Sequence, residues 1–159
     1  MKRESLYLDT SVPSAYYDER VMWRLEYTRE WWRNELPKYD VFISEVVIAE
    51  IRGTENSDRR NKLLELVKEF SELKLSPEIE EISNGYVNQK VIPQSYFPDA
   101  LHISFASFYK IDFLITWNCE HLADAHRRKR VRLFNASAGL FIPEIVTPME
   151  IVEGGKEDV

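Results

Sequence analysis

The sequence predicts an α/β fold with a mainly parallel sheet. Short apolar segments, each read as a strand, alternate along the chain with longer segments of helical periodicity. The 159 residues, 44% of them hydrophobic, suit one domain with one core. We therefore expect residues 1–152 to form a single domain and residues 153–159, rich in glycine and charge, to form a flexible tail.

The strands are predicted from short apolar runs bounded by turn-forming residues. Residues 5–8 end directly at Asp9, and residues 41–43 and 112–116 are short enough to be buried strands. Weaker strand patterns cover residues 73–75 and 145–146, and a final turn begins at Thr147. In an open α/β sheet a site lies beyond the carboxyl ends of the strands. That rule selects Asp9, residues 44–50 and residues 116–118.

The helices are predicted where apolar residues recur at three-, four- and seven-residue spacings. The clearest repeat covers residues 19–36 and stops near Pro37. Residues 10–13 are interpreted as a break after the first strand. Ser44 can cap a helix over residues 45–53. The other predicted helices cover residues 58–70, 76–91, 99–109 and 120–132.

Composition excludes several classes of protein. The net charge of −6 argues against a generally basic nucleic-acid binder, although divalent cations can offset carboxylates where a phosphate must approach. The one cysteine, Cys119, rules out an internal disulfide and a cysteine-rich zinc site. No apolar stretch approaches the roughly 20 residues needed to cross a bilayer. With no secretory signal visible, we expect a cytoplasmic protein.

Glu50 is an unusual residue for its position. In the predicted helix its neighbours at i−4 and i−3 are Val46 and Val47, so the carboxylate lies against an apolar face. A glutamate there is expected to be paired or to bind a metal. The alternative to a metal is an ion pair with Arg52 or another arginine.

Asp9 and Asp99 are predicted to lie close to Glu50. Asp9 follows the first strand, where its alternative role is an Asx-turn. Asp99 opens a helix, where its alternative role is an N-cap. Converging carboxylates raise one another's pKa unless a cation is present. Mg²⁺ and Mn²⁺ prefer oxygen ligands and can polarise a phosphate, activate water and steady a leaving oxygen.

Five segments, in order, resemble the motifs of the PIN-domain ribonucleases. Each is weak alone, but together they span nearly the whole chain. They are residues 6–11 (LYLDTS), 43–51 (ISEVVIAEI), 97–106 (FPDALHISFA), 113–122 (FLITWNCEHL) and 145–150 (IVTPME), the last with Met149 departing from a Thr-Pro-Glu-Glu turn.

The resemblance implies a three-layer α/β/α fold and Mg²⁺- or Mn²⁺-dependent cleavage of RNA. It also implies a VapC-like toxin held by a small antitoxin protein, and a homodimer, because many small members are of this kind. Asp9, Glu50 and Asp99 match three acidic metal positions of the family, and Thr116 matches the hydroxyl of the fourth motif.

Asn118 departs from the family, whose common residue there is aspartate. An amide carbonyl can coordinate a cation but adds no charge, so we expect Asn118 to be the fourth ligand of a weaker metal site. The wording Thr-Trp-Asn-Cys-x-His resembles a subgroup of the family. Glu120 or Asp124 is an alternative source of a later carboxylate, and a solvated helix face would explain both.

Several other residues invite a functional interpretation. His102, at i+3 from Asp99, is expected to be packed or hydrogen-bonded rather than a zinc ligand, and His121 is a candidate to support Asn118. Cys119 is expected to be a buried thiol.

Two surface features carry alternatives. Residues 127–132 hold five Lys or Arg, which would contact RNA phosphates or form a solvated helix face. Trp23, Trp31 and Trp32 would stack on bases, or belong to the core or a dimer surface.

Three functions follow from these residues. The first is a metal-dependent endoribonuclease with catalytic residues Asp9, Glu50, Asp99, Asn118 and Thr116, acting as the toxin of a toxin–antitoxin pair. The second is a PIN scaffold with attenuated chemistry that binds RNA or a protein partner. The third is a phosphatase-like hydrolase with Asp9 as nucleophile, which is weakened because Ser11 stands where that chemistry wants a second aspartate.

Overall fold

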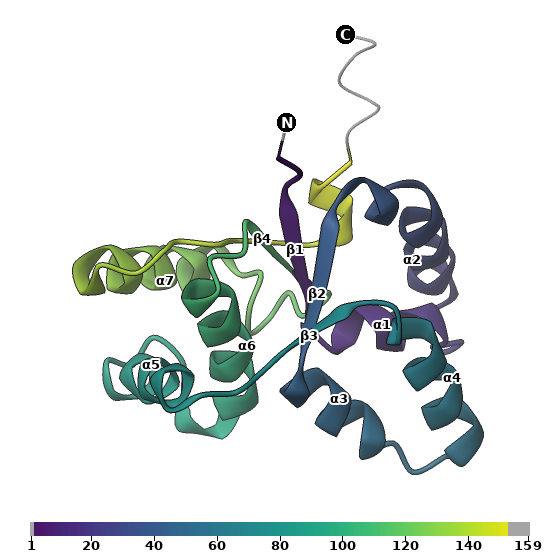
Figure 1. The fold of residues 1–159 in the computed structure, drawn as a ribbon, viewed down its shortest axis with the longest axis horizontal. Coiled ribbons are helices and arrows are strands. Elements are labelled where there is room, and N and C mark those ends of the chain that lie inside the picture. Colours follow the sequence, from purple (N-terminus) through teal and green to yellow (C-terminus); the bar gives the residue numbers. More distant parts are fainter. Residues whose placement is uncertain (1, 153–159) are drawn as a thin grey trace, which may run out of the picture.

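The computed structural model describes residues 2–152 and contains a five-stranded, all-parallel sheet (Figure 1). The strand order is β3-β2-β1-β4-β5. The predicted parallel sheet is therefore confirmed. The strands are β1 (Ser5–Leu8), β2 (Asp40–Ser44), β3 (Ser71–Leu73), β4 (Phe113–Ile115) and β5 (Glu144–Val146).

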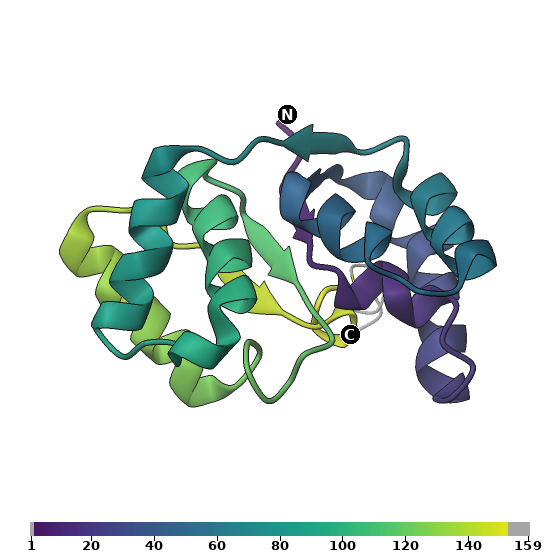
Figure 2. The ribbon, with the colours of Figure 1, turned by 90° about the horizontal axis from the view of Figure 1, so that it is seen from below.

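Helices cover the sheet on both sides, which gives the predicted three layers (Figure 2). Helices α1 to α4 gather on one side and α5 to α7 on the other. The α-helices are α1 (Ser11–Tyr16), α2 (Met22–Asn34), α3 (Glu45–Arg52), α4 (Ser57–Val67), α5 (Pro77–Asn88), α6 (Phe97–Phe108) and α7 (Ala125–Ala138). Short 3₁₀ helices are η1 (Leu36–Lys38), η2 (Gln94–Tyr96) and η3 (Pro148–Glu150).

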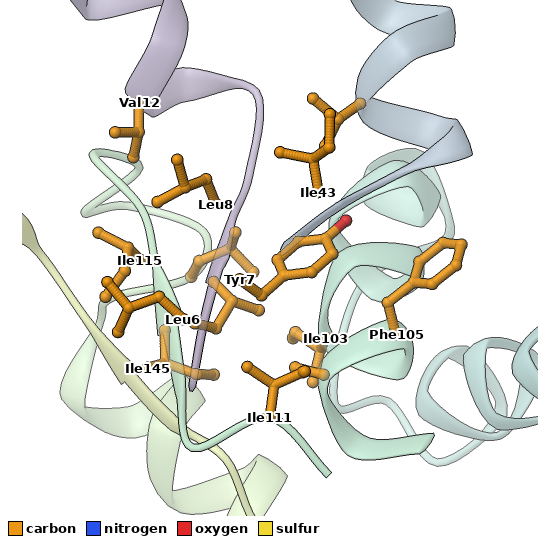
Figure 3. Packing of buried hydrophobic residues seen from close by; sticks show 14 of the residues in the cluster. Leu6, Tyr7, Leu8, Val12, Ile43, Ile103, Phe105, Ile111, Ile115 and Ile145 are labelled. Atoms are coloured by element: carbon orange, nitrogen blue, oxygen red, sulfur yellow. The ribbon is translucent and has the colours of Figure 1, made fainter. Parts of the chain in front are cut away.

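The core is centred on β1, whose apolar residues point alternately to the two faces of the sheet. Leu6, Tyr7 and Leu8 are completely buried. Figure 3 shows the Tyr7 ring extending from β1 on the side of Phe105 of α6, with its hydroxyl at the far end. A fully buried strand in the middle of a parallel sheet explains why this segment reads as a continuous apolar run that stops abruptly at a polar residue.

The first strand ends before residues 10–13, as predicted, but the helix α1 that begins at Ser11 was not predicted. Pro13 lies in the first turn of α1, where a missing N–H costs nothing. Val12, Pro13 and Ala15 are buried, so core packing adds to local preference.

The predicted helix over residues 120–132 is misplaced by several residues at both ends. Asp124 is the N-cap of α7, and Gly139, with φ +70°, ends it in the left-handed conformation that favours glycine. The chain before Asp124 turns around Asn118 instead, for reasons given below. The predicted strand over residues 73–75 overlaps β3 only at Leu73.

Among the described residues, no helix combines the length and apolar character that a membrane span requires. The tail predicted for residues 153–159 lies outside the described part of the chain.

Candidate active site

Asp9 lies at the carboxyl end of β1 with both oxygens engaged. Its Oδ1 accepts hydrogen bonds from the Ser11 backbone N–H at 3.0 Å and from the Ser11 hydroxyl at 2.5 Å. Its Oδ2 accepts one from the Thr116 hydroxyl at 2.5 Å. Burial raises the pKa of Asp9, and the Asp99 charge adds to this, while His102 and the two hydroxyls oppose it. Asp9 therefore forms the Asx-turn that was its alternative role and also lies among the candidate site residues.

Glu50 reaches the same region from α3, which Ser44 caps as predicted by accepting the Val47 N–H at 3.3 Å. Glu50 Oε1 accepts a hydrogen bond from the Thr10 hydroxyl at 2.5 Å and lies 2.8 Å from His102 Nε2. Burial alone would raise the pKa of Glu50, but the hydrogen bond and charge of His102 outweigh it and lower the pKa. Its ionic partner is thus a histidine, where the sequence suggested an arginine.

Asp99 is the third residue of α6, so the N-cap alternative is wrong. Its side chain is 19% exposed and its Oδ2 lies 3.6 Å from His121 Nδ1. Burial raises the pKa of Asp99 and the Glu50 charge adds to the rise, although His102 and His121 oppose it. Asp99 therefore lies close enough to Glu50 for the Glu50 charge to disfavour the ionised form of Asp99.

Thr116 and Asn118 follow β4 and shape the loop beside Asp9. Thr116 Oγ1 donates to Asp9 and accepts the Asn118 N–H at 2.9 Å. Asn118 Oδ1 accepts the His121 N–H at 3.0 Å, and its backbone carbonyl accepts N–H groups from residues 122 and 123. The Asn118 amide oxygen therefore closes a turn over residues 118–121, and α7 begins only after this turn.

The PIN domain family model matches residues 6–121. The chain belongs to the PIN domain family. The match covers the strand ends and helices that carry Asp9, Glu50, Asp99 and Asn118.

Solved structures of VapC and toxin–antitoxin proteins share the fold of this PIN domain. VapBC-1 from nontypeable Haemophilus influenzae is similar at 15% identity with a TM-score of 0.60, covering 91% of this chain and 98% of that one. A toxin–antitoxin complex from Klebsiella pneumoniae gives 18% identity and a TM-score of 0.58 over 76% of this chain and 92% of that one. VapC20 from Mycobacterium tuberculosis, a sarcin–ricin-loop-cleaving toxin, gives 13% and 0.55 over 72% and 91%. No curated protein sequence matches.

The donor atoms of this PIN domain suit a hard divalent cation. The three acidic side chains offer oxygen, which Mg²⁺ and Mn²⁺ prefer, and the raised pKa values of Asp9 and Asp99 mark a place where a positive charge would relieve repulsion. Within residues 2–152, no three His, Cys, Asp or Glu side chains form a ready-made metal cluster. That arrangement is compatible with Mg²⁺, which commonly uses one or two carboxylates and keeps several waters.

The two alternative carboxylates of the fourth motif do not join the site. Asp124 accepts the Arg127 N–H at 2.9 Å as the cap of α7. Glu120 is exposed on the turn. Cys119 is also exposed, so the predicted buried thiol is wrong. The turn closed by Asn118 places residues 119 and 120 at the surface, which explains why Cys119 is exposed and why Glu120 does not join the site.

The basic run and the tryptophans are each divided by the fold. Arg127 and Arg128 are partly buried, and Arg128 pairs with Glu150 at 3.1 Å, whereas residues 129, 130 and 132 are exposed on α7. Trp31 is core, Trp32 is partly buried, and Trp23 is 57% exposed and meets Trp117 edge to face.

The residues missed by the sequence lie directly behind the carboxylates. The prediction that His102 is hydrogen-bonded is confirmed, but its partners, Tyr7 and Glu50, were not foreseen. A weak signal exists for Tyr7, because it carries the only polar group among the three buried side chains of β1. A buried tyrosine usually finds a hydrogen-bond partner.

Proposed function

We propose that this PIN domain is a Mg²⁺- or Mn²⁺-dependent endoribonuclease. The observation that carries the proposal is the set of three carboxylates at the carboxyl edge of the sheet, two of which have pKa values raised by burial and by neighbouring negative charge. Raised pKa values mean that the ionised carboxylates cost the fold stability, so a ligand of positive charge is the best explanation of their placement.

Asp9, Glu50 and Asp99 would hold the cation, with Asn118 as a further oxygen donor. The bound cation supplies a polarised phosphodiester and an activated water. The hydroxyls of Ser11 and Thr116 fix both Asp9 oxygens, which removes the freedom of that carboxylate to turn away. Asn118 fixes the turn after β4 through its bond to the His121 N–H.

We further propose that the protein is the toxin of a toxin–antitoxin pair, forms a homodimer and acts in the cytoplasm. Support comes from the shared fold with the VapBC-1 protein and the Klebsiella pneumoniae toxin–antitoxin complex. A small antitoxin protein would then be its partner.

Asp9→Asn provides the direct test. Asn keeps the size of the side chain but removes its charge, so we expect RNA cleavage with Mn²⁺ to fall by at least about a hundredfold, on the scale of a lost electrostatic contact at a reacting centre. Cleavage of a single-stranded RNA is measured by gel.

Asp112→Asn is the matched control. Asp112 Oδ2 also accepts hydrogen bonds from the N–H and the hydroxyl of one serine, Ser5, at 2.9 and 3.2 Å. These two residues lie at the amino ends of β4 and β1, away from the acidic cluster. We expect its activity to equal that of wild type. Equal activity in wild type and Asp9→Asn would rule out the proposed site.

The second candidate is a PIN scaffold that binds RNA or a protein partner with attenuated chemistry. It is favoured by Asn118, which replaces an acidic residue and already uses its amide oxygen within the turn. Calorimetry with Mn²⁺ separates the two candidates. No binding at millimolar Mn²⁺ would favour the scaffold, and binding that is lost in Asp99→Ala would favour the nuclease.

A further inference from the structure

A buried chain of hydrogen bonds runs from the first residue before α3 to Glu50 near the end of the same helix. We propose that His102, held by Tyr7 and Ser44, is a positioning residue that fixes the Glu50 carboxylate. In what it says of metal binding and cleavage, the inference rests on the proposed function.

The chain is continuous and its bonds are short. Ser44 Oγ lies 2.7 Å from Tyr7 Oη, which lies 2.7 Å from His102 Nδ1. His102 Nε2 lies 2.8 Å from Glu50 Oε1. Ser44 and Tyr7 are completely buried, and His102 is 3% exposed. Because Ser44 also caps α3 through the Val47 N–H, the chain ties both ends of the helix that carries Glu50 to β1 and α6.

Both nitrogens of the imidazole are engaged, so its plane is fixed. Nε2 must donate, since an ionised Glu50 only accepts. Nδ1 either accepts the Tyr7 hydroxyl proton, in which case Ser44 donates to Tyr7, or donates to Tyr7, in which case Tyr7 donates to Ser44. Every group of the chain is satisfied in either protonation state, so the geometry at Glu50 does not depend on which one prevails.

Only one oxygen of Glu50 is taken. Thr10 and His102 both bond to Oε1, and within residues 2–152 no hydrogen bond to Oε2 is found. The glutamate side chain has three rotatable bonds, and two fixed donors on one oxygen select a single orientation. The Glu50 side chain is 37% exposed, and Oε2 is the oxygen left for a ligand in the orientation selected.

A purely structural role does not account for this arrangement. His102 is buried, yet its bond through Nε2 goes to the half-exposed carboxylate of Glu50 and not to another group of the core. Groups behind a ligand that fix its orientation are worth about 10- to 100-fold in metal affinity or activity. His102 is on the same helix as Asp99, so it also couples the position of the Glu50 carboxylate to that of the Asp99 carboxylate.

Two variants of equal charge test the proposal. In His102→Gln the amide nitrogen reaches the place of Nε2, so the bond to Glu50 is kept. In His102→Asn the shorter amide reaches the place of Nδ1, so the bond to Glu50 is lost. We expect His102→Asn to weaken Mn²⁺ binding by about tenfold. His102→Gln keeps the bond to Glu50 and loses only the bond to Tyr7, so it should weaken binding clearly less, as measured by calorimetry on the full chain.

Crystal structures of the two variants give a readout that needs neither metal nor activity. Glu50 should leave its wild-type position in His102→Asn and keep it in His102→Gln. Glu50 unmoved in both, or an equal loss of affinity in both, would overturn the proposal. If wild type bound no Mn²⁺, the proposed function would fail, while displacement of Glu50 in His102→Asn alone would still support the positioning role.

Tyr7→Phe is the second variant where a His102 variant does not fold. It removes one hydroxyl and frees the imidazole to rotate, so Mn²⁺ binding should weaken. An affinity equal to that of wild type would contradict the proposal.

Discussion

Two buried tyrosines of this protein have similar surroundings, but the hydrogen-bond networks of their hydroxyls connect different kinds of group. Tyr7 and Tyr86 are both completely buried, and each hydroxyl has two side-chain partners. The partners of Tyr86 are Ser107 at 3.0 Å and Asn135 at 2.7 Å, which join α5, α6 and α7. Burial raises the pKa of Tyr86 to about 12 and that of Tyr7 well above its usual value.

The difference lies in what the two networks contain. The network around Tyr86 is uncharged and closed, because Asn135 Nδ2 also donates to Ser107 at 2.9 Å and to the Phe141 carbonyl at 2.8 Å. The network around Tyr7 contains an imidazole and opens onto a carboxylate at the surface. The hydrogen bonds of the Tyr86 network thus hold three helices together, whereas those of the Tyr7 network orient the Glu50 carboxylate.

Asn135→Ala should have the largest effect on stability. It leaves the Tyr86 hydroxyl, the Ser107 hydroxyl and the Phe141 carbonyl each short of a buried partner, and we expect a loss of about 3 kcal/mol in the free energy of unfolding. Urea denaturation measures it, and Mn²⁺ affinity of the folded variant should be unchanged. A change in affinity would mean that the two networks are coupled.

The pair Tyr7→Phe and Tyr86→Phe separates stability from positioning. Each removes one buried hydroxyl and leaves its partners to find others, so each should cost about 1.5 kcal/mol in urea denaturation. Only Tyr7→Phe should weaken Mn²⁺ binding, by several-fold on the scale of a lost outer-shell contact. Equal Mn²⁺ affinities of the two variants would remove the functional difference between the networks.

The two regions also differ in how far the sequence predicts them. The strand ending at Asp9 and the cap at Ser44 are local features, and the structure has both as predicted. The bond between His102 and Glu50 joins residues 52 positions apart, and no spacing rule reaches that far. Asp9 and Asp99 were predicted as site residues because each adjoins the end of a predicted element, and Glu50 because its carboxylate stands on an apolar helix face. Their hydrogen-bond partners depend on tertiary packing.

Two turns have features that the sequence did not predict. Residues 10–13 end the first strand as predicted, but Pro13 also lies in the first turn of α1, where it is tolerated once Val12 and Ala15 are buried. Asn118 was judged as a metal ligand, and its capping of the turn before α7 was not foreseen, because that capping depends on where the His121 N–H points.

Asp99→Asn should have the smallest effect and the opposite sign. The pKa of Asp99 is raised by burial and by Glu50, so the folded protein holds this proton to a higher pH than the unfolded chain does. The stabilising contribution of the protonated carboxyl is complete below about pH 4, the ordinary range for aspartate, and is lost as the pH rises through the raised value. Without added cation, Asp99→Asn should therefore match wild type in stability near pH 4 and exceed it at neutral pH, by ~0.5 kcal/mol on the scale of one partly exposed charge interaction. Urea denaturation at the two pH values measures the difference, and Asp112→Asn, outside the acidic cluster, is the control.

Added Mn²⁺ should reverse the order of stability of wild type and Asp99→Asn at neutral pH, because only wild type keeps the full ligand set and binding stabilises the folded state. An unchanged order with saturating Mn²⁺ would show that Asp99 does not bind the cation and would leave the raised pKa of its carboxylate without a functional explanation.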